Sequence, residues 1–298
     1  MHYVIGTRGS KLALAQTEKV KRTLESAYPE DTFGIKIIRT AGDKNPASAL
    51  EMIGTKGIFT DEIERELLSG EIAMAVHSMK DMPGDIDERL VFSRAWTRED
   101  PRDVLILKAA DSLKELPEGA IIGTGSKRRE YQLKKLRPDI RVVGIRGNVD
   151  TRINKLYDPE QGLDGIIIAA AGIKRLKREA EITEYMPCDD IIPAPAQGIL
   201  AIEVRKDNTE LLDKLNAFAD READYAAVIE RQFLAKIGGD CHYPIGAYYD
   251  SKGIFYALFG RQDGSKLVSV KRVIVDKKAD IDKITDEVVA EILSKLKD

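Results

Sequence analysis

Short apolar runs alternate with helical patterns over the first two thirds of the chain. In residues 3–96 the pattern predicts strands at 4–6, 35–38, 72–76 and 90–93, and helices at 10–28 and 60–69. In residues 101–191 it predicts strands at 104–107, 120–123, 141–145 and 165–169. Alternation of strands and helices is typical of α/β domains. We therefore expect two such domains in tandem, each with a Gly-Thr turn before a Ser, at 6–10 and at 123–126.

Two segments interrupt this alternation. Residues 41–57 form a loop containing Gly, Asn, Pro and Ser that is long enough to be a lid or a disordered flap, and Lys56 stands near its end beside Gly57. Residues 192–198 read Ile-Pro-Ala-Pro-Ala-Gln-Gly and precede a strand-like run at 199–204. Two prolines and a glycine at such a place predict a hinge where the chain recrosses between domains.

The order of predicted helices and strands changes near residue 208. The elements expected there are helices at 209–219 and 223–237, extended runs at 254–260 and 267–276, and an amphipathic helix ending at 297. Asp263-Gly264 between the two extended runs favours a β-hairpin. The sequence thus predicts a third, small α+β domain. We place domain 1 at 1–96 with 198–207, domain 2 at 97–197 and domain 3 at 208–298.

Positive charge is concentrated in one stretch. Residues 121–156 hold ten Lys and Arg against three Asp and Glu, an excess of seven positive charges in a chain of net charge −3. The arginines that fall at turns or in first helical turns are Arg128, Arg129, Arg146 and Arg152. Helix N-termini attract anions, and arginine binds carboxylate or phosphate through two hydrogen bonds. The stretch indicates a ligand with several negative charges, although a solvated basic face is the alternative, as expected for Lys134, Lys135 and Arg137.

Composition argues against several classes of protein. No apolar run approaches the ~20 residues that cross a bilayer, and the N-terminal residues lack the pattern of a signal peptide, so we expect a cytoplasmic protein without membrane contact. The two cysteines and three histidines show no metal-ligand spacing, so no metal is expected. A nucleic-acid binder is disfavoured because aromatic residues make up only 6% of the chain and the basic residues lie at turns rather than along one stripe.

Two residues are candidates for chemistry. Asp81 follows a predicted buried strand, where α/β sheets bind ligands, and could hold a nitrogen proton or stabilise a cation; a turn cap or an ion pair with Lys80 is the alternative. Cys241 lies in a tight loop, Gly-Gly-Asp-Cys-His-Tyr-Pro-Ile-Gly, and is either an inert thiol or a covalent attachment site or nucleophile. For His77 we expect a structural role, hydrogen-bonded inside the fold.

Eight stretches together carry a family resemblance. They are the stretches at 6–16, 56–59, 75–83, 98–103, 123–129, 146–152, 171–176 and 197–198, followed by the Cys241 loop. In this order they resemble the hydroxymethylbilane synthases, also called porphobilinogen deaminases, over essentially the full chain. The resemblance implies two domains like type II periplasmic binding proteins, joined by hinges with the active site in the cleft, and a third α+β domain carrying the cysteine.

The resemblance also implies an activity. In that family the cysteine holds a dipyrromethane cofactor, built from two porphobilinogen units, through a thioether. Four porphobilinogen molecules are then added with loss of ammonia each time, and hydrolysis releases linear hydroxymethylbilane. Each pyrrole brings one acetate and one propionate, which accords with a cleft rich in arginine.

Site residues follow from the matching positions. Cys241 resembles the cofactor-bearing cysteine, and Asp81 the catalytic carboxylate that contacts pyrrole N–H groups and stabilises the cation left when ammonia departs. Residues implied to hold the cofactor with them are Lys80, Thr124, Ser126, Arg128, Arg129 and Arg146. Residues implied to bind substrate or the growing chain are Arg8, Ser10, Gln16, Lys56, Arg152, Arg175 and Gln197. Asp240, His242 and Tyr243 depart from the usual family pattern, and we assign them no role.

The resemblance implies a porphobilinogen-using monomer. The alternative is a non-catalytic cytoplasmic binding protein for a polycarboxylate, which would account for the two α/β domains but not for Cys241 or the third domain.

Overall fold

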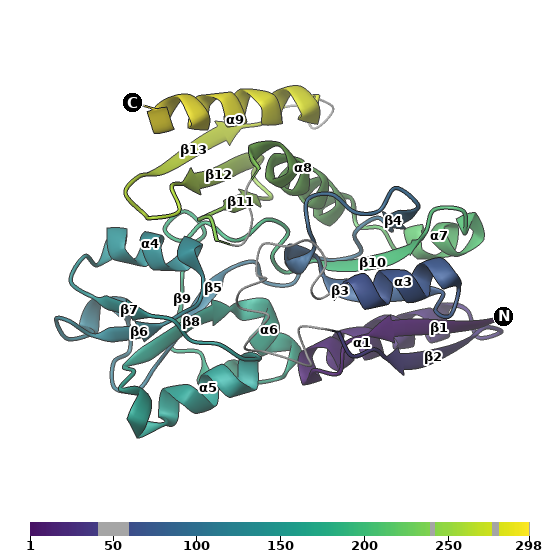
Figure 1. The fold of residues 1–298 in the computed structure, drawn as a ribbon, viewed down its shortest axis with the longest axis horizontal. Coiled ribbons are helices and arrows are strands. Elements are labelled where there is room, and N and C mark those ends of the chain that lie inside the picture. Colours follow the sequence, from purple (N-terminus) through teal and green to yellow (C-terminus); the bar gives the residue numbers. More distant parts are fainter. Residues whose placement is uncertain (41–59, 239–241, 276–279, 298) are drawn as a thin grey trace. The chain divides into compact units, whose positions relative to one another are not determined.

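The computed structural model describes residues 1–40, 60–238, 242–275 and 280–297, and the chain divides into two compact units (Figure 1). Unit 1 comprises Met1–Arg98 and Ile199–Tyr225, and unit 2 comprises Glu99–Gly198 and Ala226–Asp298. In this division the expected third domain, 208–298, is split: residues 208–225 fall in unit 1 and residues 226–298 in unit 2. The three-domain scheme stays a prediction. The loop predicted at 41–57, with Lys56, and the cysteine Cys241 lie outside the described residues.

Unit 1 is built on a five-stranded mixed sheet in the order β2-β1-β3-β10-β4. Its strands are β1 (His2–Thr7), β2 (Thr32–Ile37), β3 (Met74–Ser78), β4 (Leu90–Phe92) and β10 (Leu200–Arg205). Its helices are α1 (Lys11–Ala27), α3 (Asp61–Ser69) and α7 (Thr209–Asn216). β1 runs parallel to β2 and β3, whereas β10 runs antiparallel to β3 and β4.

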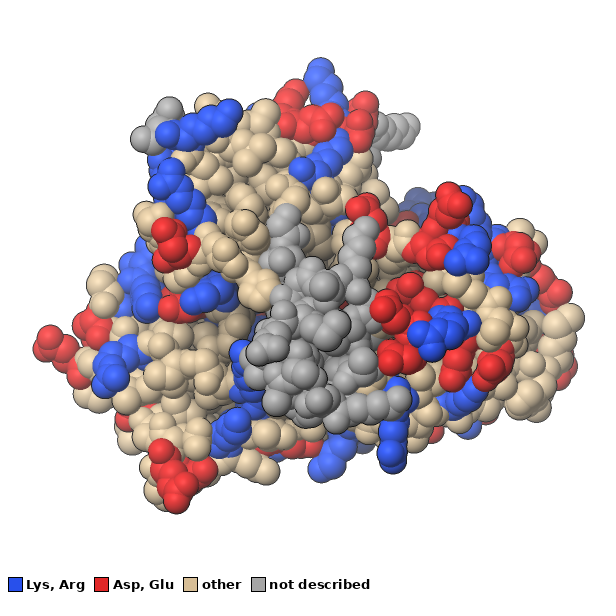
Figure 2. All heavy atoms as spheres, viewed as in Figure 1, with Lys and Arg blue, Asp and Glu red and all other residues tan. Residues whose placement is uncertain are grey.

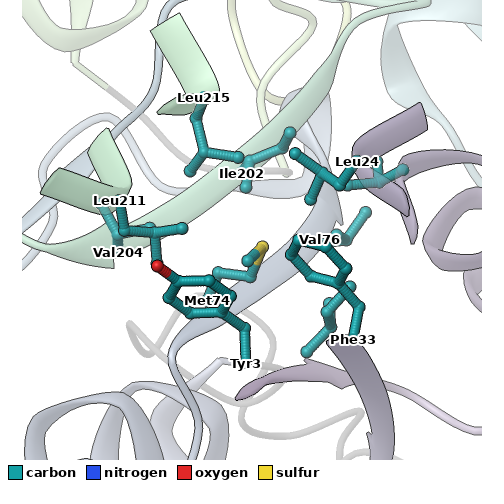
Figure 3. Close-up of a cluster of buried hydrophobic side chains, with 11 residues drawn as sticks. Tyr3, Leu24, Phe33, Met74, Val76, Ile202, Val204, Leu211 and Leu215 are labelled. Atoms are coloured by element: carbon teal, nitrogen blue, oxygen red, sulfur yellow. The ribbon is translucent and has the colours of Figure 1, made fainter. Parts of the chain in front are cut away.

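Alternation along β3 explains how this sheet is covered. Met74 and Val76 point to one face, where they pack with Ile202 of β10, Leu24 of α1 and Leu215 of α7 (Figure 3). The intervening residue, Ala75, packs on the opposite face with Ile63 and Leu67 of α3. Burial of one such large aliphatic side chain contributes about 1.5–3 kcal/mol. Apolar packing on both faces therefore holds the end of β3 in place.

The strand expected at 72–76 begins two residues later than predicted. Ile72 is buried against α3, and its N–H donates to the carbonyl of Glu66 at 3.3 Å instead of joining the sheet. Its apolar character reflects packing after the end of α3, at Gly70 with φ +79°. Because β3 runs to Ser78, it carries His77 within the sheet.

Unit 2 contains a second five-stranded sheet with the corresponding order, β7-β6-β8-β5-β9. Its strands are β5 (Asp103–Leu107), β6 (Ile121–Gly123), β7 (Arg141–Val143), β8 (Gly165–Ala169) and β9 (Glu184–Tyr185). Its helices are α4 (Lys127–Leu136), α5 (Val149–Tyr157) and α6 (Ala170–Arg175). β6 is parallel to β7 and β8, and β5 is antiparallel to β8 and β9. The prediction of two α/β folds in tandem is confirmed.

The C-terminal part of unit 2 is a three-stranded antiparallel sheet with two helices (Figure 1). Its elements are α8 (Arg221–Ile237), which begins within unit 1, β11 (Gly246–Tyr249), β12 (Ile254–Gly260), β13 (Leu267–Val273) and α9 (Ile281–Lys297). The predicted hairpin joins β12 to β13, with Gly264 at φ +76° in its turn. The sequence did not predict β11, because its four residues follow a Pro- and Gly-containing loop. In the described part of the chain, no helix is long and apolar enough to cross a membrane.

Candidate functional site

The ends of β1 and β3 bring one group of predicted site residues to the same edge of unit 1. The two strands are parallel neighbours, so their carboxyl ends meet there. Arg8 and Ser10 follow β1, and Ser10 caps α1 by accepting a hydrogen bond from the backbone N–H of Ala13 at 3.2 Å. Lys80 and Asp81 lie in a 3₁₀ turn, Met79–Asp81, directly after β3. Asp81 is exposed, as a carboxylate that meets a ligand must be.

Hydrogen bonds hold this edge from two sides. Gln16 is buried in α1, and its Nε2 donates to Oγ of Ser78 at 2.9 Å, which ties α1 to the last residue of β3. The backbone N–H of Met79 donates to the carbonyl of Ile199 at 3.0 Å. The turn that carries Asp81 is therefore anchored in the sheet rather than supported by a loop alone.

His77 has the structural role that the sequence predicted. It is buried, and its Nε2 lies 3.1 Å from Oε2 of Glu203, which is fully buried on the neighbouring strand β10. Burial of an acid and an imidazole is favourable only when the two groups satisfy each other. The pair links β3 to β10 four residues before Asp81.

Unit 1 does not present charge of one sign. Acidic and basic side chains intermingle over α3 (Figure 2), and Lys36 lies 2.9 Å from a carboxylate oxygen of Glu66 and 2.6 Å from one of Glu71. These charges are satisfied locally.

A second group of predicted residues lies at the corresponding edge of unit 2. β7, β6 and β8 are parallel, so the residues after them share one edge. Thr124 and Ser126 follow β6, Arg146 follows β7, and Arg175 ends the helix after β8. Arg146 is exposed, Thr124 is buried, and Oγ1 of Thr124 accepts the N–H of Ser126 at 3.2 Å.

Two helices begin at this edge. Ser126 is the N-cap of α4 and makes no capping hydrogen bond with its side chain, whereas Asn148 caps α5 by accepting the N–H of Thr151 at 2.9 Å. Arg152 lies in the first turns of α5, and its Nε donates to the carbonyl of Gly147 at 2.8 Å. The edge thus combines hydroxyl groups, guanidinium groups and the N-termini of two helices, which is a donor set that fits a ligand with several carboxylates.

Arg128 and Arg129 are buried beneath that edge in a network that sequence reasoning missed. Asp103, at the start of β5, accepts hydrogen bonds from Nη1 of Arg128 at 2.7 Å and from Nη2 of Arg129 at 2.8 Å. Nε2 of Gln197 donates to the same carboxylate at 3.0 Å. Burial opposes ionisation of Asp103, but the two guanidinium groups outweigh it and hold the pKa of Asp103 well below its usual range.

The same network fastens the predicted hinge within unit 2. Nη1 of Arg128 and Nε2 of Gln132 donate to the carbonyl of Ile192 at 2.7 and 3.2 Å. Nη2 of Arg175 donates to the carbonyl of Gly198 at 2.6 Å. Arg128, Arg129, Arg175 and Gln197, expected to be ligand binders, therefore also bind the protein itself.

The fold and the site residues together indicate a class of protein. An α/β fold that gathers anion-binding donors at its strand ends, with one exposed carboxylate on an anchored turn, is typical of a protein that binds a small polyanionic ligand. Of the predicted site residues, only Lys56 and Cys241 lie outside the described part of the chain.

Comparison with known proteins identifies the family within this class. The sequence profile described as "Porphobilinogen deaminase, dipyromethane cofactor binding domain" matches residues 3–213. The porphobilinogen deaminase of Lachnospira eligens is 58% identical over 94% of this chain and 96% of its own length. That of Clostridium novyi is 47% identical over 99% of both. The chain belongs to the porphobilinogen deaminase family.

Solved structures similar to the chain include binding proteins for amino acids. One is the methionine-binding protein MetQ, 11% identical over 77% of this chain and 94% of its own, with a TM-score of 0.45. Another is an arginine-specific periplasmic binding protein of Salmonella typhimurium, 18% identical over 76% and 96%, with a TM-score of 0.40.

Proposed function

We propose that this chain is a transferase of tetrapyrrole biosynthesis that joins four porphobilinogen molecules, with loss of ammonia, onto a dipyrromethane primer and releases linear hydroxymethylbilane. Membership of the porphobilinogen deaminase family supports the reaction. The observation that carries the residue assignment is the position of Asp81, exposed on the anchored turn after β3 at the edge that also holds Arg8. A binding protein for a polycarboxylate is not favoured by the family match.

Asp81 is assigned to the chemical step. When the aminomethyl group of porphobilinogen loses ammonia, the C–N electron pair leaves with nitrogen and positive charge develops on the pyrrole that remains. A carboxylate at hydrogen-bonding distance from the pyrrole N–H stabilises that charge, and it does so best when it is fixed in advance. The hydrogen bonds of Gln16 and Met79 supply that fixation.

The cofactor, when bound, supplies the free pyrrole position to which the first substrate is added. We assign its attachment to Cys241. Its carboxylates are assigned to Lys80, Thr124, Ser126, Arg128, Arg129 and Arg146. The exposure of Arg146 supports this assignment, as does the Ser126 side chain, which makes no capping hydrogen bond to α4. The contacts of Arg128 with Asp103 and Ile192 engage one of its three guanidinium nitrogens.

Residues assigned to substrate and growing chain are Arg8, Ser10, Gln16, Lys56, Arg152, Arg175 and Gln197. Their sequence positions support the assignment, as do the locations of Arg8 and Ser10 directly after β1. The three-domain division, the cytoplasmic location, the monomeric state and the absence of nucleic-acid binding remain predictions from the sequence.

The test compares Asp81→Asn and Asp81→Glu with Asp85→Asn, which removes an exposed carboxylate nearby. Each protein is incubated with porphobilinogen, and porphyrin formed by oxidation of the product is measured. We expect Asp81→Asn to lose on the order of 10²-fold or more in turnover, because one well-placed electrostatic group contributes that much. Asp81→Glu should retain more activity, and Asp85→Asn should match the wild type.

Two results would contradict the proposal. Equal losses in Asp81→Asn and Asp81→Glu would assign Asp81 a purely geometric role. Binding of porphobilinogen without turnover by the wild type, with no mass added to Cys241, would instead indicate the polycarboxylate-binding protein.

A further inference from the structure

His77 and Glu203 form a buried pair in unit 1 to which the proposed reaction gives no role. Glu203 on β10 is fully buried, and its Oε2 lies 3.1 Å from Nε2 of buried His77 on β3. In the antiparallel register Glu203 pairs with Ala75, two residues before His77. The two side chains therefore lie diagonally across one face of the sheet, where long side chains reach each other.

Stability does not account for this pair. Oε1 of Glu203 is buried without a hydrogen-bond partner, and no Lys or Arg in the described part of the chain pairs with the carboxylate. Burial raises the pKa of Glu64 on α3, and the charge of Glu203 raises it further, so the two acids oppose each other. A buried charge with one oxygen unsatisfied opposes folding, and apolar residues of similar volume often replace such pairs without loss of stability.

The pair lies at the end of β3 that leads to Asp81. The next residue, Ser78, accepts a hydrogen bond from Nε2 of Gln16 at 2.9 Å. Because side chains alternate along a strand, Gln16 holds Ser78 from the face covered by α1, and Glu203 holds His77 from the face covered by α3. Two consecutive residues are thus held on opposite faces, directly before the turn that carries Asp81.

Backbone pairing holds this end of β3 from one side only. On the side of β1, pairing with β3 is confined to Met74 and Ala75. On the side of β10, the ladder ends at Ser78, and the N–H of Met79 then donates to the carbonyl of Ile199 at 3.0 Å. The last three residues of β3 therefore depend on their side chains for further support.

We propose that His77 and Glu203 are positioning residues that hold the end of β3, and with it the carboxylate of Asp81, in the place that the reaction requires. The inference rests on the proposed role of Asp81 in stabilising the cation left when ammonia departs. Such stabilisation needs a group fixed at hydrogen-bonding distance from the atoms where charge develops. A displacement of about 1 Å costs on the order of 10²-fold in rate.

The experiment replaces the pair by apolar residues of similar volume, with His77→Leu and Glu203→Met together in the full chain. Turnover of porphobilinogen is measured as kcat and KM per folded, cofactor-loaded molecule, with loading taken from the intact-protein mass and folding from circular dichroism. Glu203→Gln keeps the volume and can still hydrogen-bond to His77. Tyr28→Phe is the matched control, because it removes the hydrogen bond from Oη of Tyr28 to the carbonyl of Lys214 in the same unit.

We expect the double variant to have a Tm no lower than that of the wild type. Its kcat should fall on the order of 10²-fold, with little change in KM, because the lost interaction acts in the transition state. Glu203→Gln should recover most of this turnover, and Tyr28→Phe should match the wild type. In an Asp81→Asn background the double substitution should lower kcat little further, because both changes act on one group.

Three results would overturn the proposal. A normal kcat in the folded double variant would show that the pair does not position the reaction. An undiminished loss of kcat in the Asp81→Asn background would show that the pair acts elsewhere. A much lower Tm, or failure to fold, would show that the pair serves stability. A wild type that does not turn over porphobilinogen would instead overturn the proposed function, which is a result distinct from these three.

Discussion

Replacing Asp103 with Asn removes one negative charge from between two buried guanidinium groups. The carboxylate accepts from Arg128, Arg129 and Gln197, at distances from 2.7 to 3.0 Å, and is fully buried. Asparagine has a single acceptor oxygen, so it cannot satisfy these donors. Two like charges would then remain close together in a region of low dielectric constant.

The expected loss of stability is large. Removing one partner of a buried ion pair costs about 3–5 kcal/mol, because the other charge is left uncompensated. For a unit of about 150–250 residues, each kcal/mol lowers Tm by about 2–4 °C, which gives a fall of roughly 6–20 °C. The total stability of a domain is only about 5–15 kcal/mol, so Asp103→Asn should remove a substantial part of the stability of unit 2.

The pH dependence supplies an independent check. The pKa of Asp103 is lower in the folded protein than its ordinary value of 3.8. The stabilisation is therefore complete above pH 3.8 and is lost as the pH falls through the folded pKa. The gap in Tm between wild type and Asp103→Asn should be constant from pH 5 to 7 and should narrow in stronger acid.

Thermal unfolding followed by circular dichroism at each pH measures this gap. Asp87→Asn is the control, because Arg89 donates to Asp87 through Nε and Nη2 at 2.9 and 2.7 Å at the surface, where an ion pair contributes little. Equal shifts in Asp103→Asn and Asp87→Asn would refute the reasoning. A gap that does not change below pH 3.8 would show that charge is not its cause.

Three further predictions concern other parts of the chain. Arg128→Leu should leave mostly protein without cofactor, whereas Arg175→Leu should give cofactor-loaded protein that accumulates a ladder of added pyrrole masses. Both results are read from intact-protein mass spectra. The same spectrum for both variants would contradict separate roles in cofactor binding and chain elongation. Burial raises the pKa of Glu64 above 4.5, so its ionisation destabilises the fold as the pH rises, and Glu64→Gln should raise Tm at pH 7 but not below pH 4. Gly165→Ala places a Cβ 2.4 Å from a methyl group of Leu107 and should lower the free energy of unfolding by about 1–3 kcal/mol, measured with urea.

Periodicity predicted the fold well because it reports local burial. The predicted strands of both five-stranded sheets and the predicted helices of unit 1 appear where apolar residues alternate or repeat, and the Asp263-Gly264 turn forms the expected hairpin. The two-residue strand β9 was not predicted. The predicted start of a strand was wrong where an apolar residue packs in the core without joining a sheet, as Ile72 does before β3. The location of Asp81 after a buried strand and the structural role of His77 were also predictable, since both depend on neighbouring residues.

Buried polar networks were not predictable in this way. Asp103 meets Arg128 across 25 positions and Gln197 across 94, and Glu230 meets Ala196 across 34. Nothing in the local pattern distinguishes such acids from the many exposed ones. Their one sequence signal is weak: Asp103 directly precedes the uninterrupted apolar run of β5, Val104–Leu107, where an exposed carboxylate would be unexpected.

Charge counted along the sequence is consequently not the charge that a ligand meets. Of the basic residues in the stretch 121–156, Arg128 and Arg129 are neutralised in part by Asp103, which lies outside it, and Lys134 pairs with Glu130 at 2.8 Å. Arg146 is exposed at the strand edge. We therefore expect a substitution at Arg128 to change both folding and the proposed anion binding, and one at Arg146 to change the proposed anion binding with little effect on folding. Loss of cofactor in a fully folded Arg146 variant is the result that would identify a carboxylate site at this edge.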